Sequence, residues 1–252
     1  LLYEKKQVLI SLLFLTAVLL KNLSGDHLHT HTSVSKDSIY SMYTEQKNGH
    51  EIKYIISFTS ENPESYMFHI PNVHLVEAIA GMLNIPIIKK STKGIKEEEL
   101  KDIEDALASL KGKIDGIITG ATASNYQKER IDKICKKLGL ASLAPIWQKH
   151  PENTLRSMIN EGFEIMIVGV AAPPLDEKWL GRIVDQKCVD ELVELNKKYG
   201  IHILFEGGEC ESLVLDCPIY PKKIVVGDAE VKWDPKSKSG HYIVKKMRFE
   251  EK

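Results

Sequence analysis

Residues 33–38 combine side chains that could bind the phosphates of a nucleotide. They are three hydroxyls, one ammonium group and one carboxylate, from Ser33, Ser35, Ser38, Lys36 and Asp37. Hydroxyls and a lysine suit an anion, a following helix would add free backbone N–H groups, and Asp37 is the candidate Mg²⁺ ligand. The stretch is not a Walker-type P-loop, because the glycines and the Lys-Ser pair of that motif are missing. The alternative interpretation is an ordinary surface turn.

A second group of polar residues, 60–69, follows a β-rich run. It reads Ser-Glu-Asn-Pro-Glu-Ser-Tyr-Met-Phe-His. Loops that follow strands commonly carry ligand-binding residues in α/β sheets. Ser65, Tyr66 and His69 therefore are candidates to face the nucleotide or a bound carboxylate. The alternative is a capped loop in which Tyr66 and Met67 pack inward.

The stretch from Gly120 follows another apolar run. Glycine there permits a close approach of the backbone to a ligand, and a helix starting near Ser124 would aim its N-terminus at the same edge. Tyr126, Gln127 and Arg130 fall within two turns of that helix. Arg130 is a candidate clamp for phosphate or adenylate, and a solvated charged face is the alternative.

Two further segments concentrate acidic and aromatic residues. Trp179 lies in Leu-Asp-Glu-Lys-Trp-Leu-Gly-Arg and either contacts a ligand or fills a seam between domains. Residues 205–212 hold three carboxylates beside two glycines, namely Glu206, Glu209, Glu211, Gly207 and Gly208. Such closely spaced carboxylates repel unless a cation answers them. The alternative is a glycine hairpin with solvated glutamates.

Metal-binding patterns are weak. His27, His29 and His31 would share one face of a strand, and Cys210 and Cys217 could join a histidine around zinc. The four cysteines form no CxxC pair, so we interpret them as reduced thiols of a cytosolic protein.

The charge balance bears on partners. The 34 basic and 35 acidic residues nearly cancel. No global field therefore attracts the chain to nucleic acid or to a membrane, and any polyanion must be met locally. The oligomeric state is open, with a homodimer among the options.

The elements that must position these residues alternate between helix and strand up to about residue 170. Helical patterns occupy 38–48, 72–84, 97–111 and 124–140, and strand patterns occupy 51–58, 114–120 and 163–172. This alternation predicts a mostly parallel sheet covered on both faces. A helix at 188–200 and two β-rich stretches follow, which indicates a smaller α+β domain.

The N-terminal segment is atypical. Lys5 and Lys6 precede an apolar run over residues 8–20, which is too short for a membrane span and similar to part of a signal peptide. We favour a buried element that either supplies the first strand of the sheet or packs over it. The predicted organisation is a segment 1–32, a nucleotide-binding domain 33–145 and a substrate-binding domain 146–252.

Several blocks carry a family resemblance. Ser33, Lys36, Asp37 and Ser38 match the Ser-Gly-Gly-Lys-Asp-Ser loop of ATP pyrophosphatases. Residues 60–69, 120–140, 169–182 and 206–212 resemble the diphthine–ammonia ligases within that group. The resemblance extends from about residue 33 to the C-terminus, and it implies a Rossmann-like (HUP-type) sheet.

The resemblance also implies a reaction. ATP would activate the carboxylate of diphthine on translation elongation factor two, releasing pyrophosphate, and ammonia would displace AMP. The loop 33–38, Gly120, Tyr126, Gln127 and Arg130 would serve ATP and Mg²⁺. The fixed cation of diphthine would contact the carboxylates of residues 206–211, with Trp179 or Trp147, and His69 would help to bind the substrate.

This sequence departs from the family at Val34 and Ser35, where two glycines are expected. A β-branched valine resists positive φ, so a reshaped loop is expected. One alternative is therefore a nucleotide-binding or partner-binding protein with impaired catalysis. Another is an ATP pyrophosphatase that acts on a small molecule or on RNA.

Overall fold

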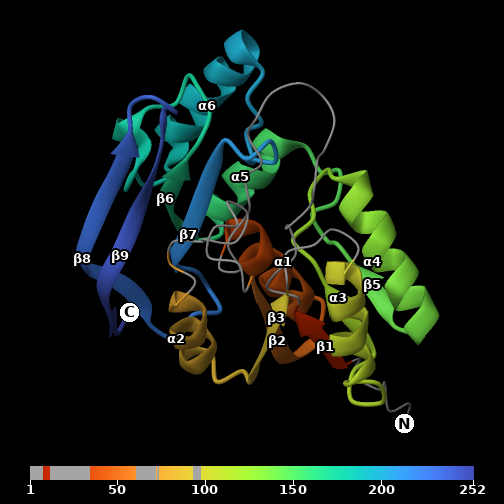
Figure 1. The fold of residues 1–252 in the computed structure, drawn as a ribbon. Helices are drawn as coiled ribbons and strands as arrows, with labels where there is room; N and C mark the ends of the chain where they lie inside the picture. The colour runs from red at the N-terminus through yellow and green to blue at the C-terminus, as the bar shows by residue number, and fades with distance from the viewer. Residues whose placement is uncertain (1–7, 12–34, 61–71, 73, 93–97) are drawn as a thin grey trace.

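The computed structural model describes residues 8–11, 35–60, 72, 74–92 and 98–252. Its described elements build two sheets, the first from the N-terminal half of the chain and the second from the C-terminal half (Figure 1). The first sheet has the strand order β3-β2-β1-β4-β5, and every pair is parallel. Its strands are β1 (Val8–Ser11), β2 (Glu51–Ser60), β3 (Ile87–Thr92), β4 (Gly116–Ile118) and β5 (Ala141–Leu143). The expected parallel sheet is confirmed for these strands, but the strand predicted over residues 163–172 lies in the second sheet, where its pairs are antiparallel.

The central position of this sheet is occupied by β1. It pairs with β2 on one side and with β4 on the other. The apolar run 8–20 thus supplies the first strand, which was one of the two arrangements expected for it. Val8–Ser11, predicted as part of a separate segment 1–32, belong to the sheet. Residues 12–20 lie outside the described residues.

Helices follow the strands of this sheet. They are α1 (Lys36–Lys47), α2 (Leu75–Met82), α3 (Glu98–Ala108) and α4 (Asn125–Leu138). Ser124 precedes α4 in extended conformation and Gly139 ends it with a positive φ, as the sequence predicted. Helix α1 begins two residues before its predicted start at Ser38, so Lys36 and Asp37 belong to its first turn.

Apolar residues cover both faces of the first sheet. Ile55 and Ile118 pack with α1 and α2, whereas Ile56 and Ile117 pack with α3 and α4. Neighbouring residues of a strand point to opposite faces, which explains this division. Helix α1 contacts β2 and β4, and it also contacts β7 (Cys210–Asp216) of the second sheet. The start of α1 therefore lies between the two halves of the chain.

The second sheet is antiparallel, with the strand order β7-β6-β9-β8. Its other strands are β6 (Glu164–Val170), β8 (Lys223–Asp234) and β9 (Ser239–Glu250). Strand β6 is buried from Ile165 onward, as its continuous apolar sequence predicted. The remaining elements are α5 (Pro151–Asn160), the short 3₁₀ helix η1 (Glu177–Trp179) and α6 (Gln186–Tyr199).

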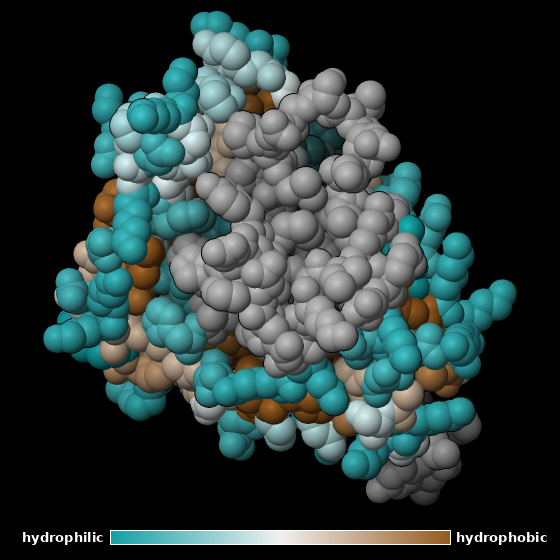
Figure 2. Space-filling model, in the orientation of Figure 1, coloured by the Kyte–Doolittle hydropathy of each residue, from teal (hydrophilic) through white to brown (hydrophobic). Residues whose placement is uncertain are grey.

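The described surface on the face in view is mostly hydrophilic (Figure 2). No helix among the described residues is both long and apolar enough to cross a bilayer. All four cysteines are buried free thiols, which agrees with the interpretation that they are reduced.

Candidate functional site

The first turn of α1 carries two buried charges. Lys36 is 1% exposed and Asp37 is 8% exposed. The ammonium of Lys36 donates to Asp37 Oδ2 at 2.8 Å and to the carbonyl of Leu204 at 2.9 Å. It also lies 4.8 Å from the centre of the Phe205 ring. The candidate phosphate lysine is therefore held by the segment that leads into the acidic residues 206–211.

Backbone amides at the start of α1 face the same place. The first hydrogen bond within the helix runs from Ile39 N to Ser35 O, so the amides of the preceding residues have no acceptor within the helix. The amide of Lys36 donates instead to Ser212 Oγ at 3.2 Å. Ser35 and Ser38 place their hydroxyl oxygens 3.5 Å apart. This cluster of donors at the positive end of a helix suits an anion.

Ser35 has an ordinary extended backbone, with φ −65° and ψ 155°. Any residue type adopts this conformation without strain. Ser35 is therefore accommodated without strain, and the expected reshaping of the loop stays a prediction. Ser33 and Val34 lie outside the described residues.

Gly120 lies directly against this helix start. A Cβ at that position would come within 2.8 Å of Ser38 N and 2.9 Å of Asp37 C, both backbone atoms. The close approach predicted for this glycine is thus an approach to α1. The end of β4 and the beginning of α1 form one continuous backbone surface.

The three clustered glutamates have separate environments. Glu206 accepts hydrogen bonds from the amide of Thr122, at 3.0 Å, and from the Thr122 hydroxyl. Glu209 accepts one from the amide of His202 at 2.7 Å. Its second oxygen, Oε2, is buried and has no hydrogen-bond partner among the described residues.

Glu211 is enclosed between two strands. Its side chain packs on Gly169, where an added Cβ would lie 2.9 Å from Glu211 Cβ, and its Oε2 lies 4.0 Å from His241 Nδ1. Burial raises the pKa of Glu211 to about 8. The carboxyl is consequently protonated at neutral pH and presents no negative charge to a cation.

The structure explains why both residues between Glu206 and Glu209 are glycines. A Cβ at Gly207 would come within 2.5 Å of Glu209 Oε1, and Gly208 has φ +78°. Side chains larger than hydrogen would displace the Glu209 carboxylate or strain the turn.

His202 is a residue that the sequence analysis missed. Its Nδ1 accepts the amides of Leu204, at 3.3 Å, and Glu206, at 3.4 Å. Burial lowers its pKa, which favours the neutral imidazole that can accept these bonds. The available signal was one polar residue inside the apolar run Ile-His-Ile-Leu-Phe.

Residues of α4 lie after the Gly120 loop. Arg130 is partly exposed in the second turn of the helix. Tyr126 and Gln127 belong to the first turn, but their side chains lie outside the described part of the chain. His69 lies entirely outside the described residues.

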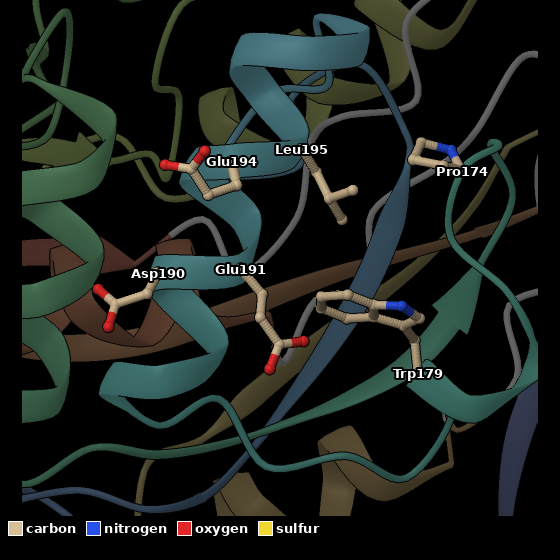
Figure 3. Close-up of a pocket in the computed structure, with 6 residues that line it drawn as sticks. All are labelled: Pro174, Trp179, Asp190, Glu191, Glu194 and Leu195. Carbon is tan, nitrogen blue, oxygen red and sulfur yellow. The ribbon is translucent and has the colours of Figure 1, made fainter.

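Trp179 borders a different cavity of about 440 Å³ (Figure 3). The lining residues are Pro174, Trp179, Asp190, Glu191, Glu194 and Leu195. The guanidinium of Arg182 lies 4.5 Å from the Trp179 ring centre and pairs with Glu191 at 2.6 Å. The structure thus brings Trp179 together with carboxylates of α6, and none of residues 206–211 lines this cavity.

The described residues contain no group of three or more His, Cys, Asp or Glu side chains arranged to hold a metal. His27, His29 and His31 lie outside them. Asp37 nevertheless offers one suitable atom, because its Oδ1 is buried without a hydrogen-bond partner in this part of the chain. A carboxylate oxygen of this kind fits Mg²⁺ bound together with phosphate oxygens.

Comparisons with known proteins cover both halves of the chain. A family model described as the diphthamide synthase N-terminal domain matches residues 29–142, and one described as the diphthamide synthase C-terminal domain matches residues 150–249. A crystal structure described as a predicted subunit of tRNA methyltransferase from Methanocaldococcus jannaschii is 13% identical and covers 85% of this chain and 98% of its own. Its TM-score is 0.43, and we draw no conclusion from it.

Curated relatives share the same name. The human diphthine–ammonia ligase is 36% identical over 220 residues, which cover 79% of this chain and 82% of that protein. The Bos taurus enzyme is 34% identical with the same coverage. The Schizosaccharomyces pombe enzyme is 32% identical over 79% of this chain and 36% of its own length. With both domain models matched in order, the chain belongs to the diphthine–ammonia ligase family.

Proposed function

We propose that the protein is an ATP-dependent diphthine–ammonia ligase. The diphthine carboxylate of translation elongation factor two attacks the α-phosphorus of ATP, and pyrophosphate leaves. Ammonia then attacks the carbonyl carbon of the acyl-adenylate, AMP leaves, and one proton is released as the amide forms. The observation that carries this proposal is the match of both family domains, in order, to a chain in which Lys36 at the start of α1 contacts Leu204, two residues before the acidic segment 206–211.

The nucleotide site lies at the start of α1. In the strand order β3-β2-β1-β4-β5, successive strands are added on one side of β1 up to β3 and on its other side from β4 onward. The switch point between β1 and β4 is where α/β sheets of the Rossmann-like (HUP) type bind ligands. Residues 33–38 receive the pyrophosphate, with Lys36 as its cation. Gly120 keeps the adjacent backbone close, and Tyr126, Gln127 and Arg130 serve the adenylate.

Mg²⁺ is held by Asp37 Oδ1 in this proposal. When bound, it would neutralise charge on the departing pyrophosphate. The protein's own contribution is to keep Asp37 oriented, through the contact of Asp37 Oδ2 with the Lys36 ammonium. The low exposure of both side chains strengthens the attraction of Lys36 to phosphate and of Asp37 to the metal cation.

The acceptor lies on the side of β7. Glu209 is the candidate partner of the diphthine trimethylammonium group, since its Oε2 is buried and has no hydrogen bond in the described structure. Gly207 and Gly208 let that carboxylate keep its position. Glu211, protonated at neutral pH, contributes shape and a hydrogen-bond donor. Trp147 is the candidate aromatic face for this cation, because Trp179 lines the separate cavity beside α6.

We also propose a domain boundary and a cellular compartment. The nucleotide-binding domain ends near residue 145 and the acceptor domain follows. Four reduced cysteines suit the cytoplasm.

The decisive experiment measures pyrophosphate release with ATP, Mg²⁺, ammonium and diphthine-modified elongation factor two. We expect AMP and pyrophosphate in equal amounts, and amide on the factor by mass spectrometry. Unmodified factor is the matched control and should give neither product. ATP binding without turnover would instead support a nucleotide-binding protein with impaired catalysis. Pyrophosphate release at the same rate with and without the modified factor would indicate an ATP pyrophosphatase with another acceptor.

A further inference from the structure

Glu206 is bound by the opposite half of the chain. It lies between α6 and β7 in the chain, yet its Oε1 accepts hydrogen bonds from both the amide and the hydroxyl of Thr122, in the loop between β4 and α4. Thr122 is 4% exposed. A carboxylate that receives two donors from one buried residue is fixed in orientation. This environment differs from that of Glu209, whose Oε2 has no hydrogen-bond partner in the described structure.

Thr122 is in turn connected to the start of α1. Its carbonyl accepts the amide of Gln148 at 2.7 Å, which fixes the loop from its other side. Two residues earlier, Gly120 lies against the backbone of Ser38. A displacement of Thr122 would therefore also move Gly120 relative to the first turn of α1, either away from it or against it.

The segment that holds Glu206 makes a second attachment at the same place. Leu204, two residues before Glu206, accepts a hydrogen bond from Lys36 Nζ at 2.9 Å. Residues 204–206 thus form hydrogen bonds with the nucleotide-binding domain at two points, one at Lys36 of α1 and one at Thr122 in the loop after β4. We call this pair of contacts the 204–206 clamp.

We propose that Glu206 is a positioning residue of the nucleotide site rather than a ligand of the acceptor. Acting through Thr122, it holds the Gly120 loop against the first turn of α1 and so sets the position of the amides that face the phosphates. This inference rests on the proposed function. It gives Glu206 a different role from the one that the clustering of three glutamates predicted.

Removing the carboxylate leaves two donors of Thr122 without their acceptor. In Glu206→Ala we expect MgATP binding to weaken about 10- to 100-fold, the range that follows from losing charge-assisted hydrogen bonds. Turnover should fall by about 10²-fold, because small displacements of reacting groups are that costly. The KM for modified elongation factor should stay within about twofold, since Glu206 does not contact the acceptor.

Three further variants separate positioning from charge. Glu206→Gln keeps an oxygen that accepts from Thr122 and should bind MgATP within about threefold of the original chain. Thr122→Val removes the hydroxyl alone and should show a smaller loss than Glu206→Ala. The double variant should be no worse than Glu206→Ala, because both changes break one interaction. Glu230→Ala, an exposed carboxylate paired with Lys245, is the matched control and should change nothing.

The measurements are calorimetric titration of MgATP, which needs no acceptor, and steady-state pyrophosphate release. Thermal unfolding of each variant checks that it is folded, and the comparison of Glu206→Gln with Thr122→Val decides if Glu206→Ala does not fold. The inference is overturned if Glu206→Gln is as impaired as Glu206→Ala, if only the KM for the factor changes, or if the two losses add. A wild-type chain that binds no MgATP refutes the proposed function itself, and this role with it.

Discussion

The contact between Gly120 and α1 leads to a sharp prediction. In Gly120→Ala the new methyl group would lie 2.8 Å from Ser38 N and 2.9 Å from Asp37 C. Both are backbone atoms of the first helical turn and cannot rotate away. Either the loop or the start of α1 must move.

The expected size follows from two opposing effects. Inserting a methyl group into a packed site costs about 1–3 kcal/mol. Replacing glycine by alanine also restricts the unfolded chain, which stabilises the protein by roughly 0.4–1 kcal/mol. The steric cost is larger, so the free energy of unfolding should fall. For a chain of this size the melting temperature drops by about 2–4 °C per kcal/mol.

Gly81→Ala is the matched control. Gly81 is exposed in α2, and a Cβ there meets nothing within 4 Å. Alanine is favoured over glycine in a helix by about 1 kcal/mol, so this variant should be more stable than the original chain. The two substitutions are chemically identical and have opposite predicted signs.

Scanning calorimetry and titration with MgATP measure the two consequences. Gly120→Ala should melt earlier and bind MgATP more weakly, whereas Gly81→Ala should melt later and bind normally. A Gly120→Ala protein with unchanged melting temperature and unchanged MgATP affinity would refute the reasoning.

Three other predictions test separate features. Ser35→Gly should leave pyrophosphate release within about twofold, because Ser35 already has φ −65° and glycine replaces serine before a helix at a cost of only tenths of a kcal/mol; a tenfold gain would show that the loop requires glycine. Glu211, with a pKa of about 8 against 4.5 when unfolded, stays protonated while the unfolded chain ionises. As the pH rises between these two values, the free energy of unfolding of the original chain should therefore fall relative to that of Glu211→Gln, by up to about 1.4 kcal/mol per pH unit. Urea titrations at several pH values measure this difference, and parallel pH profiles of the two proteins would contradict the burial of this carboxyl. The four buried cysteines, whose pKa values are all raised by burial, should react with a thiol reagent only after unfolding in guanidinium; rapid labelling of the native protein would argue against their burial.

Local patterns predicted several elements in both halves of the chain. Ser124 and Gly139 mark the ends of α4: Ser124 has an extended backbone and makes no capping hydrogen bond with its side chain, and Gly139 ends the helix with a positive φ. The buried strand β6 was evident from its unbroken apolar run. The start of α1 was placed two residues late, because Lys36 and Asp37 read as loop residues until the fold buries them at a helix terminus.

The acidic segment shows where such patterns stop. Glu206, Glu209 and Glu211 have the same side chain within six residues, and sequence reasoning gave them one shared task. In the structure they meet Thr122, the amide of His202, and the packed surface beside Gly169, respectively. Those partners lie elsewhere in the chain, up to 84 residues away in the case of Thr122.

The sequence by itself determined the residue types and the order of the elements, since turns, caps and apolar periodicity act over a few neighbouring residues. It therefore pointed to the family, the alternation of helices and strands, and the chemistry available at residues 33–38. Only the tertiary structure decided that Val8–Ser11 is the central strand, that Leu204 holds Lys36, and that Glu206 faces Thr122. These outcomes depend on burial and on contacts between distant segments. Burial also sets which carboxyl is charged, and no single stretch of the chain contains that information.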